Sequence, residues 1–363
     1  MRKRRNSKRR IFVIVIAIIL ICIATYFIIK NFNNKNTVVE NVNGSSNFEI
    51  SSEPEVEPEP EKNIKIFNGN DRAIAFMIDN NTNAQPQASI NSTYMVYEII
   101  VEGGETRLMA LFKGTNADQV GPIRSSRHYF LDYAMENDAI YAHLGMSPQA
   151  QSDMELFKIN NINGQAYDTG KARTSSSLYW RASHKKAPHN AYTNTESILK
   201  IAKDKGYKTT SNKESVLNYV TEEVNLENEN SIIASTITIP YAPGHKVKYV
   251  YNEDTKRYTR YSKGKKMSDE ITNENITTKN IIITFSKNYT LNDGENKGRQ
   301  DVVTVGSLDG YYITNGKAIK IKCNKTDRKS QTQYVDLNGN EIEVNDGNTW
   351  VNVCPIDADV VIE

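Results

Sequence analysis

The stretch TYMVYEIIVEGGETRLMALFK, residues 93–113, decides the predicted fold of the first half of the chain. Apolar and β-branched residues fill both arms of this stretch, and Gly103-Gly104 lies between them. Two such runs on either side of a glycine-containing turn are typical of a β-hairpin. Upstream, RAIAFMID at residues 72–79 predicts a further strand.

Helices are predicted after these strands. The sequence IRSSRHYFLDYAMEND follows Gly121-Pro122, and a proline there suits the first position of a helix. Two more helices are predicted at 196–205 and 214–222, the second because Ser211 and Glu214 have the spacing of a capping box. Residues 63–225 are therefore predicted to form a mixed α/β domain.

Beyond residue 232 the pattern becomes strand-like. Short runs such as STITIPY, HKVKYVY, NIIITF and AIKIKC are separated by turn residues. Asn315-Gly316 and Asn338-Gly339 each lie between two runs, and Asn-Gly pairs favour the type I′ turn of a two-residue hairpin. Residues 226–363 are therefore predicted to form a β-rich domain, and the folded chain as a whole is predicted to be α+β.

The N-terminus predicts a membrane anchor. Residues 1–10 carry seven basic residues and no acidic one, and residues 11–29 form a run of nineteen residues without a charge. A helix of that length spans about 28 Å, close to the hydrocarbon thickness of a bilayer. The basic flank places residues 1–10 in the cytoplasm. We therefore predict a signal-anchor with one transmembrane helix at 11–29, and with the folded domains outside the cell membrane.

Two alternatives for this segment have less support. A cleaved signal peptide begins in a similar way, but this apolar run is long and no Ala-x-Ala-like site follows it. A lipoprotein would use Cys22, but Ile21 precedes it where a small residue usually stands. Residues 30–62 follow the anchor and end in SSEPEVEPEPEK, a composition that predicts a disordered, extended stalk.

Charge and cysteine content exclude some classes of function. The whole chain has a net charge of +2, but without residues 1–10 it has 38 basic and 43 acidic residues. This acidic outer part argues against nucleic-acid binding by the folded domains. Cys323 and Cys354 could form one disulfide or remain as two buried thiols. No cysteine spacing indicates a metal site, and no cofactor is predicted.

Polar clusters in the first half supply the candidate ligand-binding residues. The segment GPIRSSR could hold an anion, because Arg124 and Arg127 offer bidentate donors and a helix N-terminus would add free N–H groups. Alternatively, one arginine pairs with a carboxylate such as Glu102 and the other is solvated. The full set of predicted ligand-binding residues is Asp79, Glu102, Thr106, Arg107, Arg124, Ser125, Arg127, His143, His189 and Asn190.

An enzymatic role would need different chemistry from the same region. Cleavage of a glycan usually uses a carboxyl group with a raised pKa that faces a second group. Glu98 and Glu102 are the candidates for that acid, with Asp79 or His143 assisting, although glutamates in a hairpin are more often ion-paired or exposed to solvent. The sequence contains neither GxSxG nor HExxH, so it gives no support to a serine hydrolase or a zinc protease.

These clusters also carry a resemblance to a known family. MIDN, VYE, EGG, GPIRSSR, HLGMSP and APHN in the first half, with KYVYNEDTKRYTRY, NGK and DGNTW in the second, resemble the bacterial YerB-like family. That family has two adjacent domains of unknown function, both numbered DUF3048. The resemblance covers residues 71–357 and implies export, but no established catalytic activity. The chain departs from it in having an apolar helix where members often carry a lipidated cysteine, and Cys323 where a tryptophan is expected.

Three hypotheses follow for the function. The first is a membrane-anchored, extracytoplasmic accessory protein of the cell envelope that binds peptidoglycan or an anionic wall polymer. The second is an enzyme that cleaves or remodels cell-wall glycan with Glu102 or Glu98. The third is a scaffold for membrane partners, which would show neither binding nor turnover. The stalk, the anchor and the absence of a catalytic signature favour the first.

Overall fold

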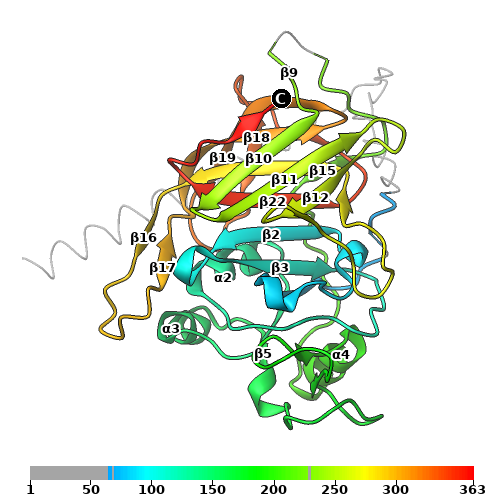
Figure 1. Ribbon diagram of the computed structural model, residues 1–363, viewed down its shortest axis with the longest axis vertical. Helices are drawn as coiled ribbons and strands as arrows, with labels where there is room; N and C mark the ends of the chain where they lie inside the picture. The colour runs from blue at the N-terminus through cyan, green and yellow to red at the C-terminus, as the bar shows by residue number, and fades with distance from the viewer. Residues whose placement is uncertain (1–63, 68, 228–229) are drawn as a thin grey trace, which may run out of the picture. The chain divides into compact units, whose positions relative to one another are not determined.

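The computed structural model describes residues 64–67, 69–227 and 230–363, which are coloured from blue to red in Figure 1. The predicted tail at 1–10, the transmembrane helix at 11–29 and the stalk at 30–62 lie outside these residues. Within the described ranges, no helix combines the length and the apolar character that crossing a membrane requires. The membrane anchor therefore stays a prediction.

The first half of the described chain mixes strands and helices. Its strands are β1 (Ile74–Asp79), β2 (Met95–Ile100), β3 (Thr106–Phe112), β4 (Ile140–His143), β5 (Asn161–Asn163), β6 (Trp180–Arg181), β7 (Ala191–Tyr192) and β8 (Asn218–Val220). Its α-helices are α2 (His128–Glu136), α3 (Pro148–Phe157) and α4 (Thr195–Asp204). Short 3-10 helices occupy Thr82–Ala84, Ile90–Ser92, Glu102–Gly104 and Gly164–Ala166.

The predicted hairpin around Gly103-Gly104 is confirmed. Strands β2 and β3 pair in antiparallel register, from Met95 opposite Leu111 to Ile100 opposite Thr106. Gly103 and Gly104 have φ of 69° and 71°, a backbone conformation that residues with a Cβ rarely adopt. Every residue of both strands is buried, because the hairpin lies in the middle of a wide sheet.

The second half is almost entirely β-structure. Its strands are β9 (Ile232–Ile233), β10 (Thr236–Ala242), β11 (His245–Asn252), β12 (Arg257–Ser262), β13 (Lys265–Lys266), β14 (Thr277–Thr278), β15 (Asn280–Ser286), β16 (Asn288–Thr290), β17 (Gln300–Val302), β18 (Gly306–Thr314), β19 (Lys317–Lys325), β20 (Gln333–Asp336), β21 (Glu343–Asn345), β22 (Thr349–Pro355) and β23 (Val361–Ile362). The prediction of a mixed first half followed by a β-rich second half is confirmed.

One large sheet runs through both halves of the chain (Figure 1). Its strands follow the order β20-β19-β18-β15-β22-β2-β3-β1-β4-β5. The junction is formed by β22, which pairs in parallel with β15 on one side and with β2 on the other. The division predicted at residue 225 therefore falls in a chain whose central sheet is continuous.

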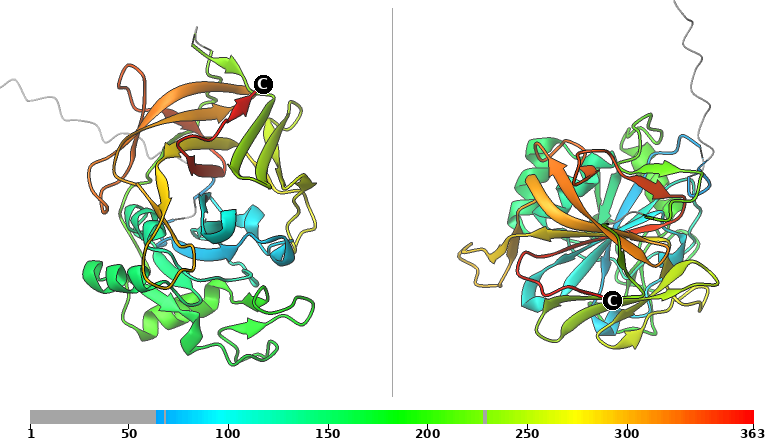
Figure 2. Two further views of the ribbon diagram at one scale, coloured as in Figure 1. Left: turned by 60° about the vertical axis from the view of Figure 1, so that its left-hand side comes forward. Right: turned by 90° about the horizontal axis from the view of Figure 1, so that it is seen from above.

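A second sheet, in the order β13-β12-β11-β10-β23, packs against the second half of the large one. The Tyr241 and Tyr249 hydroxyls, from β10 and β11, both donate to Asn352 Oδ1 on β22, at 3.3 and 3.1 Å. Apolar side chains fill the space around them, including the fully buried Ile237, Val247 and Trp350. In Figure 2 the yellow-to-red strands gather at one end of the molecule and the green helices at the other.

Two local predictions are wrong, and a third is wrong in its loop length. The predicted helix after Gly121-Pro122 begins only at His128. Residues 120–126 are extended instead, and they form isolated β-bridges with β1, with the loop after β4 and with Thr193. The predicted helix at 214–222 contains strand β8, which pairs with β21. The turn at Asn338-Gly339 does make a hairpin, in which Val335 lies opposite Glu341 and Ile342 N donates to Tyr334 O at 3.0 Å, but Asp336 N donates to Asn340 O, so the loop has three residues and not two.

Candidate functional site

The candidate site lies at one edge of the large sheet. Strands β1, β4 and β5 are parallel neighbours, so Asp79, His143 and Asn163 end them on the same side. Ligands of open α/β sheets bind outside these carboxyl ends. The extended segment that contains Arg124–Arg127 crosses this edge: Arg124 N donates to Met77 O at 2.8 Å, and Ser126 N to Gly145 O at 3.0 Å.

Asp79 is the centre of the first group of contacts. Its Oδ1 accepts from the backbone N–H of Asn81 at 3.0 Å. Its Oδ2 lies 2.7 Å from His189 Nδ1 and 3.1 Å from Arg124 Nε. Because an ionised carboxylate only accepts hydrogen bonds, the proton of a neutral His189 is on Nδ1. One oxygen atom therefore brings together residues from β1, the crossing segment and the loop before β7.

Glu102 is the centre of the second group. It accepts from Arg127 Nε at 2.5 Å, and Arg107 Nη2 lies 3.8 Å away. Burial raises the pKa of Glu102, but the hydrogen bond and charge of Arg127 and the charge of Arg107 outweigh it, so the pKa falls below its ordinary value. Arg107 Nη1 and Arg127 Nη1 also donate to the carbonyls of Ser125 and Ser126, at 2.5 and 2.6 Å.

The three guanidinium groups of Arg107, Arg124 and Arg127, which we call the arginine cluster, exceed the two carboxylates that face them. Burial, followed by the charges of Arg127 and Arg124, lowers the pKa of Arg107 to about 10. The Arg124 side chain is 25% exposed, and its buried Nε finds no hydrogen-bond partner among the described residues. The 3.1 Å contact with Asp79 is thus an ion pair whose angle does not suit a hydrogen bond.

The structure also separates some of the predicted ligand-binding residues from this cluster. His143 is buried: its Nδ1 lies 2.8 Å from Gly145 O and its Nε2 3.3 Å from Asn161 Oδ1, so both nitrogens contact oxygens within the fold. Burial lowers the pKa of His143. Asn190 bonds within its own loop, to Ala182 O and Arg181 Nη1. Ser125 contributes its carbonyl to Arg107.

Thr106 and Glu98 belong to a separate, buried network. Glu98 accepts from Thr106 Oγ1 at 2.7 Å and Asn80 Nδ2 at 3.0 Å, and it forms an ion pair with Arg260 Nη2. His245 Nε2 lies 3.3 Å from the Thr106 hydroxyl. Burial raises the pKa of Glu98, but the charge of Arg260 and the hydrogen bonds from His245 and Thr106 outweigh it and lower the pKa to about 2.

Sequence reasoning missed Arg260 and His245, because they follow Glu98 by more than 140 residues and lie in ordinary strand patterns. A tyrosine-rich strand with two arginines, Arg257 and Arg260, offered the only signal. The guanidinium of Arg260 lies 4.3 Å from the centre of the Trp350 ring, which helps to explain its full burial. This network joins the two sheets and does not reach solvent.

The two outer cysteines are free and buried in the structure. Burial raises the pKa of both the Cys323 and the Cys354 thiol to about 12. Of the two alternatives left open by the sequence, the structure shows two buried thiols. Within the described part of the chain, no group of three or more histidine, cysteine or acidic side chains could hold a metal ion.

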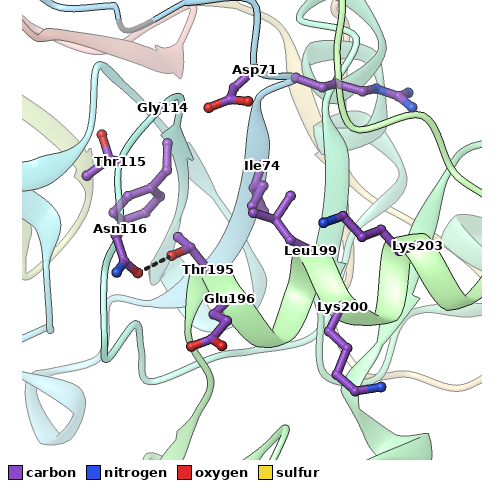
Figure 3. A pocket seen from close by; sticks show the side chains of 12 residues that line it. Asp71, Ile74, Gly114, Thr115, Asn116, Thr195, Glu196, Leu199, Lys200 and Lys203 are labelled. Carbon is purple, nitrogen blue, oxygen red and sulfur yellow. Dashed lines mark hydrogen bonds between the residues drawn. The ribbon is translucent and has the colours of Figure 1, made fainter.

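A cavity of about 540 Å³ lies at the opposite end of β1 (Figure 3). Ile74, Phe112 and Leu199 supply apolar lining, and α4 adds the charged side chains of Glu196, Lys200 and Lys203, of which Lys203 points towards Ile74 in Figure 3. None of the predicted site residues lines it. The arginine cluster is therefore separate from this cavity: Arg107 and Arg127 are buried, and the Arg124 side chain is 25% exposed.

Comparison with known proteins places the chain in a family. The N-terminal domain of the protein of unknown function DUF3048 matches residues 61–208, and the C-terminal domain of DUF3048 matches residues 237–351. The chain belongs to the YerB-like family. The resemblance predicted from the sequence motifs is therefore confirmed.

Two relatives in this family are informative. The chain is 29% identical over 295 residues to a Bacillus subtilis protein named "Putative lipoprotein YerB", and the match covers 78% of this chain and 81% of the relative. The crystal structure of the YerB protein from Bacillus subtilis superimposes with a TM-score of 0.68 at 28% identity. That match covers 80% of this chain and 94% of the crystallised one, so the similarity extends over both halves of the fold.

Proposed function

We propose that this protein is an extracytoplasmic accessory protein of the cell envelope that binds an anionic ligand at the arginine cluster. The observation that carries the proposal is the convergence of Arg107, Arg124 and Arg127 on only two carboxylates, at the carboxyl edge of β1 and β4. An anion with several oxygens would balance the excess positive charge and accept from Arg124.

The location rests on separate support. A Bacillus subtilis relative carries the word lipoprotein in its name, and the basic residues 1–10 followed by the apolar run at 11–29 predict a permanent anchor in this chain. Both kinds of attachment hold the folded region at the outer face of the membrane. Peptidoglycan and phosphate-rich wall polymers are the anionic ligands within reach there.

The alternative of a glycan-cleaving enzyme that uses Glu98 or Glu102 has less support. A general acid needs a raised pKa, whereas ion pairs lower the pKa of both glutamates. Glu98 is also fully buried, and Arg260, Thr106 and Asn80 surround its carboxylate.

The test is a binding measurement on the full chain in detergent micelles. The probe is soluble poly(glycerol phosphate), with a neutral polyglycerol as the reference ligand. Arg124→Gln removes one charge from the cluster, and Arg173→Gln removes one charge outside it, from an arginine that pairs with Asp118. Because a charged hydrogen bond contributes about 1.5–3 kcal/mol, we expect Arg124→Gln to weaken binding at least tenfold and Arg173→Gln to change it little.

Two results would contradict the proposal. One is the absence of any preference of the wild-type protein for the phosphate polymer over the neutral one. The other is an equal loss of affinity in the two variants, which would show that binding depends on net charge and not on the arginine cluster.

A further inference from the structure

His189 differs from the other four histidines of the chain. His128, His184 and His245 each place Nε2 within 3.3 Å of a polar side chain, and both nitrogens of the buried His143 have partners. His189 instead uses Nδ1 for its contact with Asp79, and its Nε2 has no hydrogen-bond partner among the described residues. Its side chain is 17% exposed, and Nε2 is not one of the buried side-chain atoms that lack a partner, so this nitrogen reaches solvent.

The loop that carries His189 is held by contacts of Lys185. Lys185 Nζ donates to the carbonyls of Ala84 and Pro86 at 2.9 and 2.5 Å, and it lies 2.7 Å from the Tyr192 hydroxyl and 2.5 Å from Glu270 Oε2. The backbone N–H of His189 donates to Lys186 O at 2.9 Å. The Lys185 contacts anchor the loop to the segment before β2 and to Glu270.

Asp79 orients the ring in the manner that acid–base chemistry requires. The carboxylate accepts the Nδ1 proton, which leaves the lone pair of a neutral imidazole on Nε2. The same oxygen, Asp79 Oδ2, is the atom that Arg124 approaches. An anion bound by Arg124 therefore lies beside the imidazole, and Asp79 is a positioning residue that serves both.

We propose that His189 is a general base for the hydrolysis of phosphodiesters bound at the arginine cluster. In the proposed step, His189 Nε2 removes a proton from a water molecule as the water oxygen forms a bond to phosphorus. The bond between phosphorus and the leaving oxygen breaks, and the imidazolium returns its proton to that oxygen. Arg124 and its neighbours stabilise the added negative charge on the phosphoryl oxygens. This inference rests on the proposed anion site.

The test measures release of 4-nitrophenol from bis(4-nitrophenyl) phosphate by the full chain in detergent micelles. His189→Gln removes the base, and His184→Gln changes a histidine of the same loop that is 55% exposed and pairs with Glu270. A general base contributes about 10²–10⁴-fold, so we expect His189→Gln to lower kcat at least 100-fold and His184→Gln to leave it within twofold. Asp79→Asn should lower kcat without raising KM, because Arg124 then loses its competing carboxylate.

The outcomes separate this inference from the proposed function. Binding of poly(glycerol phosphate) without turnover by the wild-type protein would overturn the hydrolase and leave the anion site intact. Turnover that persists in His189→Gln would overturn the role of His189. If the wild-type protein neither binds the polymer nor releases 4-nitrophenol, both proposals fail. Thermal unfolding of each variant, compared with the wild type, shows that lost activity is not lost folding.

Discussion

At the scale of single residues, the ionisation of Glu98 makes the stability of the protein depend on pH. Its pKa of about 2 in the folded protein lies below its ordinary value of 4.5, so its contribution is complete above about pH 4.5 and is lost as the pH falls towards 2. The difference corresponds to roughly 3 kcal/mol. We expect the free energy of unfolding, measured with urea, to decrease over this range.

Glu98→Gln provides the corresponding variant. It leaves the Arg260 charge buried without its carboxylate, which should cost about 3–5 kcal/mol at pH 7. The variant should also lose less stability than the wild type between pH 4.5 and 2. Glu196→Gln, an exposed substitution on α4, is the matched control and should behave like the wild type. An equal pH dependence in Glu98→Gln and the wild type would contradict this account.

Residue types were predictable from the sequence, but most of their partners were not. The exception is the proposed pairing of one arginine with Glu102, which Arg127 makes. Glu98, Asp79 and the arginines stood out as polar groups within or beside apolar runs. The hydrogen bond between Asp79 and His189, however, joins residues 110 positions apart, and Arg260 is 162 positions from Glu98. Such contacts depend on strand order in the sheet, and one sequence without its fold does not determine that order.

At the scale of elements, the hairpin at Asn315-Gly316 is the most sharply specified turn. Thr314 pairs with Lys317, and the two residues between them have φ of 48° and 74°, as a type I′ turn requires. A Cβ on Gly316 would lie 2.9 Å from Tyr251 Cε1. The prediction of this hairpin from the Asn-Gly pair is confirmed.

Gly316→Ala should therefore destabilise the protein more than Gly339→Ala. Gly339 also has positive φ, at 90°, but a Cβ there would meet nothing within 4 Å. Backbone strain costs each variant about 1–2 kcal/mol, and the contact with Tyr251 should add roughly 1 kcal/mol more at Gly316. Midpoints of urea unfolding measure the difference. Equal losses would show that Tyr251 moves aside freely.

The elements that were predicted wrongly share one cause. Residues 122–127 have local signals for a helix, yet Ile123 bridges Ile78 and Ser126 bridges Met146. Residues 214–222 fit a capping box, yet Asn218–Val220 pairs with β21. In both segments, pairing with a distant strand satisfies the backbone groups and overrides local propensity. The hairpins were predictable because their partners are adjacent in the sequence.

At the scale of the whole molecule, α2 ties the two halves together through buried charges. Glu136 accepts from Lys325 Nζ at 2.8 Å and from Thr332 Oγ1 at 2.7 Å. Asp132 accepts from Arg328 Nε at 2.8 Å. Together with the pairing of β2 and β22, these contacts mean that each half covers buried groups of the other. The two halves should therefore fold as one unit.

The two tryptophans of the chain test this cooperativity, because Trp180 lies in the first half and Trp350 in the second. Fluorescence of the Trp180→Phe protein reports the second half through Trp350, and fluorescence of the Trp350→Phe protein reports the first half through Trp180. Circular dichroism measures the stability change that each substitution causes, and the fluorescence transitions are corrected for that change. We expect one shared transition in urea.

Lys325→Met leaves Glu136 buried without its cation, so it should lower the unfolding free energy reported by both probes by about 3–5 kcal/mol. Lys322→Met, which changes an exposed lysine of the same strand that pairs with Asp309, should shift neither. Two separated transitions, or a loss confined to the Trp350 probe, would mean that the continuous sheet does not couple the halves.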